Sequence, residues 1–179
     1  MKQSARTVRD TSSLRGLIAA LALCAGIGGS AFLTALPARA DEVATPTTLT
    51  LATAQRVIAA AQRKAVELGA PCAIAVVDPA GYLVAFTRMD ASPMLASVEL
   101  APRKARTAAL FGKPTQQLEQ AIHDGRTAAV TSGFVQMSGG VPLVVDGHEI
   151  GAIGVSSARP DWDIDIATSA AAVAGPASH

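Results

Sequence analysis

Two short segments of this 179-residue chain gather side chains that could bind a flat, apolar anion. The first is Arg88-Met89-Asp90-Ala91-Ser92-Pro93, and the second is Arg103-Lys104-Ala105-Arg106-Thr107-Ala108. Arginine and lysine can bind carboxylates, and the small residues between them leave room for an apolar ring. The same composition is also typical of a solvated basic helix face. The pattern alone therefore leaves both interpretations open.

The three histidines and the two cysteines offer little further chemistry. His123 is expected on the polar side of a helix end, His148 beside an exposed turn, and His179 in a disordered tail. None has a partner at the spacing of a zinc site, so no dedicated metal site is predicted. Cys72 begins a predicted core strand, where a buried and inert thiol is expected.

Acidic and glycine-rich stretches have structural interpretations. Asp161, Asp163 and Asp165 lack the glycine and closing glutamate of a calcium loop, so we interpret them as acids at the start of a helix. No lysine follows Gly139-Gly140 or the Gly151/Gly154 pair, which excludes a phosphate loop and favours close backbone approach within strands. No Ser-His-Asp arrangement can be derived from the spacing.

Hydrophobic spacing and turn residues predict the elements that would position these groups. Thr50 is expected to cap a first helix that ends at Gly69, and Asp78-Pro79-Ala80-Gly81 and Asp146-Gly147 are expected to turn two β-hairpins. Pro102 is expected to start or kink a helix within residues 94–111, and Thr115 to cap the next one. The predicted helices cover 51–68, 94–111, 115–123 and 163–174; the predicted strands cover 72–77, 82–88, 132–138, 141–145 and 149–156.

This order of helix, hairpin, helices, hairpin and helix predicts an α+β fold. Hairpins separated by helices imply an antiparallel sheet of about five strands with helices packed on it, rather than a doubly wound parallel sheet.

The first forty residues have the pattern of a cleavable secretion signal. Basic residues precede Arg15, an apolar run extends from Gly16 to about Leu36, and Ala38-Arg39-Ala40 forms an A-x-A site. We expect cleavage after Ala40 and a secreted or periplasmic protein. The alternative is a retained membrane anchor, because the apolar run is close to membrane-spanning length.

Cleavage would change the electrostatic character of the protein. It would leave 10 basic and 13 acidic residues, without a basic run that could bind nucleic acid or a membrane surface. Cys72 would be the one remaining cysteine, which excludes an intrachain disulfide. We expect a signal peptide at 1–40, a flexible leader at 41–48, one domain at 49–175 and a disordered tail at 176–179.

Six segments in order resemble the GlcG/HbpS-like family, which includes extracellular haem-binding proteins and the C-terminal domain of PduO-type corrinoid adenosyltransferases. The resemblance covers residues 49–175. It is carried by Ala75-Val76-Val77-Asp78-x-x-Gly81, Phe86-x-Arg88-Met89-Asp90, Lys104-Ala-x-Thr107-Ala108, Pro114-Thr115, Gly139-Gly140-Val141-Pro142-Leu143 and Gly147-x-x-Ile150-Gly151-Ala152-Ile153-Gly154-Val155-Ser156. The family commonly continues as Gly-Val-Ser-Gly-Gly, whereas this chain has Ser157-Ala158-Arg159-Pro160 after Ser156.

The resemblance implies an antiparallel sheet flanked by helices, a haem or similar tetrapyrrole ligand, and a homo-oligomer. It makes the Thr107 hydroxyl a candidate haem-iron ligand. The expected binding residues are Arg88, Met89, Asp90, Arg103, Lys104 and Thr107.

The expected function is a secreted haem-binding protein for scavenging, storage, or redox or iron sensing. One alternative is a module that binds a small organic acid, which the same basic segments could hold. Another is a weak haem- or iron-dependent peroxidase-like enzyme. Non-catalytic binding is favoured because no acid–base pair of recognisable spacing is present.

Overall fold

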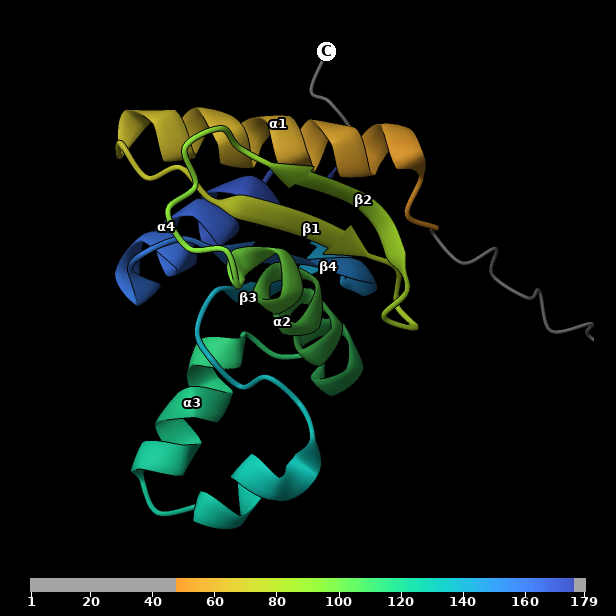
Figure 1. The fold of residues 1–179 in the computed structure, drawn as a ribbon. Helices are drawn as coiled ribbons and strands as arrows, with labels where there is room; N and C mark the ends of the chain where they lie inside the picture. The colour runs from red at the N-terminus through yellow and green to blue at the C-terminus, as the bar shows by residue number, and fades with distance from the viewer. Residues whose placement is uncertain (1–47, 176–179) are drawn as a thin grey trace, which may run out of the picture. The chain divides into compact units, whose positions relative to one another are not determined.

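The computed structural model describes residues 48–175, which form one four-stranded antiparallel sheet with helices on both faces (Figure 1). The strand order across the sheet is β2-β1-β4-β3. The elements in chain order are α1 (Leu51–Glu67), β1 (Ala73–Val77), β2 (Leu83–Arg88), α2 (Ser97–Phe111), α3 (Thr115–His123), η1 (Thr127–Ser132), β3 (Gly140–Val145), β4 (His148–Ser156) and α4 (Pro160–Ala171). The predicted α+β class is confirmed.

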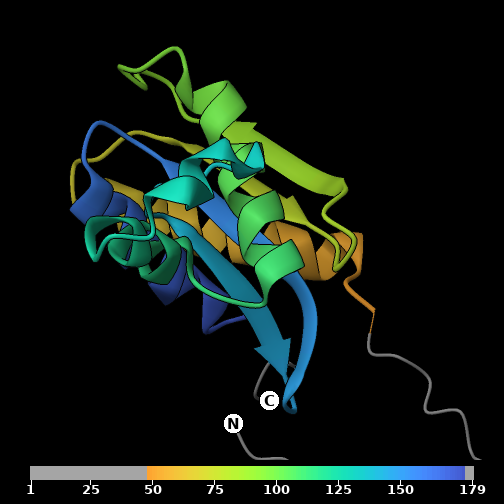
Figure 2. The ribbon, with the colours of Figure 1, turned by 90° about the horizontal axis from the view of Figure 1, so that it is seen from below.

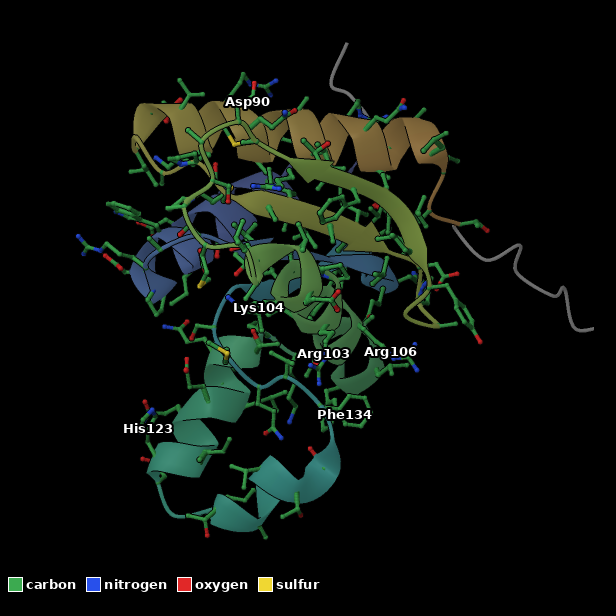
Figure 3. All side chains as sticks on the ribbon, in the orientation of Figure 1. Asp90, Arg103, Lys104, Arg106, His123 and Phe134 are labelled. Atoms are coloured by element: carbon green, nitrogen blue, oxygen red, sulfur yellow. The ribbon has the colours of Figure 1, made fainter. Side chains whose placement is uncertain are left out.

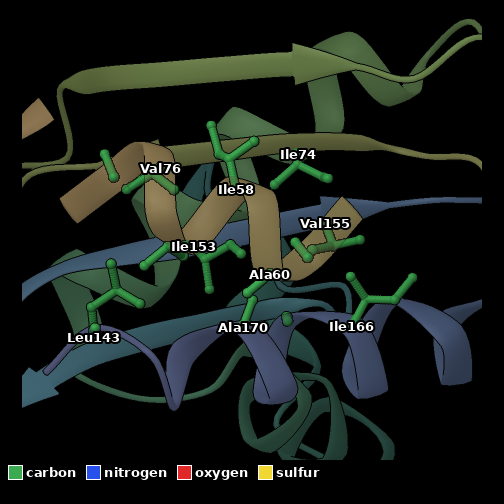
Figure 4. Close-up of a cluster of buried hydrophobic side chains, with 14 of the residues drawn as sticks. Ile58, Ala60, Ile74, Val76, Leu143, Ile153, Val155, Ile166 and Ala170 are labelled. Carbon is green, nitrogen blue, oxygen red and sulfur yellow. The ribbon is translucent and has the colours of Figure 1, made fainter. Parts of the chain in front are cut away.

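The larger core lies between the sheet and helices α1 and α4 (Figure 4). Alternate residues of β1 and β4 point to this side, among them Ile74, Val76, Ile153 and Val155. They pack with apolar residues of the two helices, such as Val57 and Ile166, and all of these side chains are buried. Successive residues of a strand point to opposite faces, and because helices cover both faces every residue of β1 is buried.

The predicted helix cap at Thr50 and the predicted hairpin turn at Asp146-Gly147 are both confirmed. The Thr50 side chain accepts a hydrogen bond of 3.1 Å from the Thr53 backbone N–H, so Thr50 caps α1. Asp146 and Gly147 have φ values of 51° and 78° at the β3–β4 turn. Positive φ at both central residues is the geometry that makes Asp-Gly a strong hairpin sequence.

Helix α2 lies directly on the other face of the sheet, because small residues line both surfaces. Ala101, Ala105, Ala108 and Ala109 meet Ala73, Ala75, Val77 and Ala152. A methyl group on Gly154 would overlap the Ala101 carbonyl oxygen, and one on Gly140 would lie 2.7 Å from the Thr115 methyl carbon. The close backbone approach predicted for these glycines is confirmed, and it fixes α2 against β4.

The predicted strand at 132–138 is wrong. Residues Thr127–Ser132 form the short helix η1, and the chain then continues without regular structure to β3. The Gln136 side chain explains this course: its Nε2 donates to the Ala129 carbonyl at 2.7 Å and to Ser132 Oγ at 3.0 Å. These bonds hold the segment against η1 instead of against a strand.

The helix boundaries also differ from the prediction in three places. Helix α2 runs through Pro102 without a new start, and α4 begins at Pro160 rather than at residue 163. Pro160 is the first residue of α4, where a helix needs no N–H from it, whereas Pro102 lies inside α2 and removes one hydrogen bond of that helix. Thr115 is the first residue of α3 rather than its cap, and its hydroxyl instead accepts a 2.8 Å hydrogen bond from the Gly140 N–H.

The predicted signal peptide, nearly all of the predicted leader and the predicted tail lie outside the described residues, as does His179. Within residues 48–175, no helix is both long and apolar enough to cross a membrane.

Candidate functional site

An apolar hollow of about 360 Å³ lies between α3, η1 and the segment that leads to β3. Both ribbon views place α3 and η1 on the α2 side of the sheet (Figures 1 and 2). The volume is within the range of roughly 300–1,000 Å³ that is typical of small-molecule sites. Its walls consist of Glu119, Ile122, His123, Val130, Phe134, Val135, Gln136 and Met137.

The wall formed by residues 134–137 is held in place by specific contacts. The Phe134 ring packs edge-on against Phe111 of α2, with 5.1 Å between the ring centroids. Gln136 is bonded to η1 as described above, and the N–H and hydroxyl of Ser138 both donate to the Glu119 carboxylate. The segment therefore forms a fixed partition although it contains no regular secondary structure.

A second cavity of about 150 Å³ lies on the α2 side of this partition. It is lined by Arg103, Arg106, Thr107, Gly133, Phe134 and Val135. Because Phe134 and Val135 line both spaces, the arginine-lined cavity adjoins the apolar hollow. Both arginines are exposed, and Figure 3 shows them beside Phe134. Arg106 Nη1 also donates to the Ala80 and Gly81 carbonyls at 3.4 and 3.3 Å.

Thr107 lines the second cavity, but its side chain is buried. Its Oγ1 donates a 2.8 Å hydrogen bond to the Arg103 carbonyl one turn earlier in α2. This is the back-bond that threonine commonly makes within helices. The one hydroxyl proton is therefore already used inside the helix.

Lys104 points away from both spaces, into the protein interior. Its side chain is 2% exposed, and its Nζ donates to Asp163 Oδ2 at 2.7 Å and to the Val155 carbonyl at 3.1 Å. Burial raises the pKa of the Asp163 carboxyl, while Lys104 and the hydrogen bonds from Ser157 act in the opposite direction. Asp161 and Asp163 both lie in the first turn of α4, as predicted, but Asp163 is buried in this ion pair, whereas Asp161 is exposed and pairs with Arg159.

The ion pair borders a third cavity of about 130 Å³. Glu119 and Met137 line this cavity as well as the hollow, and its other walls include Ser157, Ala158, Arg159 and Pro160. The loop 157–160, which departs from the family pattern, therefore lines this third cavity and is not part of the wall of the hollow.

Arg88, Met89 and Asp90 lie elsewhere. The Met89 N–H donates to the Cys72 carbonyl at 3.0 Å, and its side chain packs on the core that includes α1. Asp90 follows β2, and Figure 3 shows it far from Arg103, whose cavity it does not line. The structure brings Arg103 and Thr107 together at one cavity, and it does not bring the 88–90 segment to them.

Cys72 and His148, the other two side chains considered as reactive or metal-binding groups, lie outside these cavities. Cys72 is buried, and burial raises the pKa of its thiol to about 12, which agrees with the predicted inert thiol. His148 is exposed in the β3–β4 hairpin, where its Nδ1 lies 2.9 Å from the Asp146 carbonyl oxygen. Residues 48–175 contain no group of three His, Cys, Asp or Glu side chains that could hold a metal ion.

The sequence did not single out most of the residues that line the hollow. Glu119, Phe134 and Met137 carry no motif, and His123 is expected to be only a solvated helix end. The one usable signal is the moderate apolar content of residues 130–137, most of which are predicted from sequence to form a strand.

The family model described as "Haem degrading protein HbpS-like" matches residues 49–172. The chain belongs to the HbpS-like family. Among curated proteins, it is 44% identical to protein GlcG of Escherichia coli K12 over 104 residues, which cover 58% of this chain and 77% of GlcG. It is also 31% identical over 140 residues to the corrinoid adenosyltransferase PduO of Salmonella typhimurium, covering 75% of this chain and 41% of PduO.

Two solved structures with the same fold are more than 25% identical to this chain and cover most of it. HbpS of Streptomyces reticuli, solved as a double mutant, is 32% identical with a TM-score of 0.67, covering 80% of this chain and 97% of that one. A structure described as a PduOC:heme complex is 30% identical with a TM-score of 0.63, covering 70% of this chain and 94% of that one.

Proposed function

We propose that this protein binds haem or a closely related tetrapyrrole in the apolar hollow. The observation that carries the proposal is the shared wall of Phe134 and Val135, which places an apolar space beside two exposed arginines. A tetrapyrrole with carboxylate side chains needs both environments next to each other. Membership of the HbpS-like family and the likeness to a haem complex support the same ligand.

The residues present fit such a group. Ile122, Val130 and Phe134 offer apolar contacts for a macrocycle. Arg103 and Arg106 offer guanidinium donors that suit carboxylates, since a guanidinium can donate two parallel hydrogen bonds. When bound, haem supplies an iron that can take protein ligands on its two open faces.

A titration with hemin, followed by absorption, tests this proposal. The purified protein without residues 1–40 should give a saturable Soret shift at micromolar concentration. Arg103→Ala combined with Arg106→Ala should weaken hemin binding by about tenfold or more, because about 1.5–3 kcal/mol is typical of one hydrogen bond to a charged group. Arg63→Ala, an exposed arginine on α1, is the matched control and should leave the midpoint unchanged.

A flat titration of the unmodified protein would reject haem as the ligand. The small-organic-acid alternative would then gain weight, because the arginine-lined cavity of about 150 Å³ is large enough for a small carboxylate. Native mass spectrometry of the isolated protein would identify such a ligand. Peroxide turnover that requires hemin would support the peroxidase-like alternative.

We further propose that the protein works outside the cytoplasm, where it scavenges, stores or senses haem. The support is the signal-like sequence of the first forty residues. Expression of the full chain followed by fractionation and N-terminal sequencing should locate a product that begins at Asp41. A product that begins at Met1 and stays in the cytoplasm would reject export.

The expected homo-oligomer also stays a prediction. Strand β2 is an edge of the sheet, and its Leu83 and Phe86 are exposed. Edge strands with apolar side chains can pair with another chain. Light scattering at several protein concentrations measures the mass of the assembly directly, and a constant monomer mass would contradict the prediction.

A further inference from the structure

His123 lines the hollow, although it lies in the last turn of α3, where the sequence favours a solvated side chain. It is the one imidazole among the residues that line the described cavities. Its ring is exposed, and no described contact occupies its nitrogens. It belongs to helix α3, which is held in place by two hydrogen bonds. Thr115 accepts one from the Gly140 N–H, and Glu119 accepts one from the Ser138 N–H.

Thr107, the candidate iron ligand suggested by the family resemblance, is placed less favourably than His123 for binding iron in the hollow. Thr107 is fully buried, and its Oγ1 is bonded to the Arg103 carbonyl at 2.8 Å. It lines the smaller arginine-lined cavity and is not part of the wall of the hollow. An iron bound by Thr107 would require α2 to expose a side chain that is fully buried.

Met137 is the other iron-binding side chain type in the wall of the hollow, and it is 45% exposed. It lies in the segment without regular structure, and a thioether is a weaker acceptor than a neutral imidazole. Histidine is the protein ligand that holds haem iron in several haem-protein classes, alone or together with methionine. Because α3 holds His123 in place, we favour His123 over Met137 as the iron ligand.

We propose that His123 is an axial ligand of the iron when haem occupies the hollow, and that Thr107 is not. This inference depends on the proposed haem binding. It assigns the iron to the α3 side of the hollow and the carboxylate groups to the α2 side, where Arg103 and Arg106 lie.

Pulsed EPR of the ferric hemin complex tests the ligand directly. Protein grown with ¹⁵N-histidine should show coupling between the iron and an imidazole nitrogen. His123→Ala should lose this coupling and bind hemin at least about tenfold more weakly, since even changes behind a metal ligand can cost that much. His148→Ala, which removes an exposed histidine outside the hollow, should retain both the coupling and the affinity, and Thr107→Val should retain the coupling.

The outcomes separate this inference from the proposed function. If unmodified protein binds no hemin, the proposed function fails and the inference fails with it. If it binds hemin but the nitrogen coupling is absent, or persists in His123→Ala, haem binding stands and the ligand assignment is overturned. If exogenous imidazole restores the coupling and affinity of His123→Gly, the assignment is supported by a result that a purely structural role of His123 would not produce.

Discussion

Lys104 Nζ lies 2.7 Å from the Asp163 carboxylate, and both side chains are buried between α2, β4 and α4. The same ammonium group donates to the Val155 carbonyl of β4, while Ser157 donates twice to the other oxygen of Asp163. These bonds join the helix on one face of the sheet to the helix on the other. Lys104 therefore has a structural role in the fold and does not face the hollow.

Removal of the lysine charge should strongly destabilise the protein. Lys104→Met would leave Asp163 as an uncompensated buried charge, which typically costs about 3–5 kcal/mol of unfolding free energy. Urea denaturation measures this loss. Lys113→Met, at an exposed position, should change the unfolding free energy by less than about 0.5 kcal/mol.

A second variant distinguishes charge from packing. If Lys104→Met is combined with Asp163→Leu, much of the lost stability should return, because replacing both members of a buried pair with apolar residues is often close to neutral. A double variant that is as unstable as the two single variants added together would contradict this account.

Stability should also depend on pH through Glu149. Burial raises the pKa of this carboxyl above its ordinary value of 4.5, and its Oε1 is buried without a hydrogen-bond partner in the structure. The folded protein therefore holds the proton more tightly than the unfolded chain does. This contribution to stability is complete below pH 4.5 and is lost as the pH rises through the higher folded-state pKa.

The matched variant is Glu149→Gln, which keeps the shape and cannot ionise. Thermal melts should show that the variant lacks the part of the decline in stability that Glu149 causes above pH 4.5. Parallel melting curves for the two proteins across this range would show that Glu149 contributes no such dependence.

Close contact between α2 and β4 should make Gly154 intolerant of a methyl group. In Gly154→Ala the added carbon would meet the Ala101 carbonyl oxygen and the Ala105 N–H, both of which are backbone atoms that cannot rotate away. Overpacking of this kind typically costs about 1–3 kcal/mol. Gly175→Ala is the control, because nothing lies within 4 Å of its added carbon and its φ is not in the left-handed region. Equal unfolding free energies for the two variants would contradict the close packing.

Local sequence signals predict much of the sheet and most helices. Thr50 bonds to a residue three positions away, and Asp146-Gly147 determine the turn that they themselves form. Their roles can therefore be derived from the sequence without knowledge of the fold. The error at 132–138 has a different origin. The side chain of Gln136 bonds back to η1, and this contact overrides the strand-like composition of the segment.

The site was harder to predict because its residues meet only in three dimensions. Lys104 and Asp163 are separated by 59 positions, so neither residue type nor spacing indicates that one neutralises the other. His123 gains significance only from the partition formed by residues 134–137, which has no periodic pattern. Arg103 and Thr107 share a cavity because they lie one turn apart on α2, and this is the part of the predicted cluster that the helix alone could bring together.

The central claim is that haem occupies the hollow between α3, η1 and residues 134–137. It is tested most directly by hemin titration of two matched variants, Val130→Asp and Val66→Asp. Both valines are exposed, at 64% and 71%, but only Val130 lines the hollow, whereas Val66 lies on α1. We predict a saturable Soret shift with the same midpoint for the unmodified protein and Val66→Asp, and a midpoint raised by about tenfold or more for Val130→Asp, since a carboxylate in an apolar wall is costly to desolvate. Identical titrations for all three proteins, or no shift in any of them, would contradict the claim.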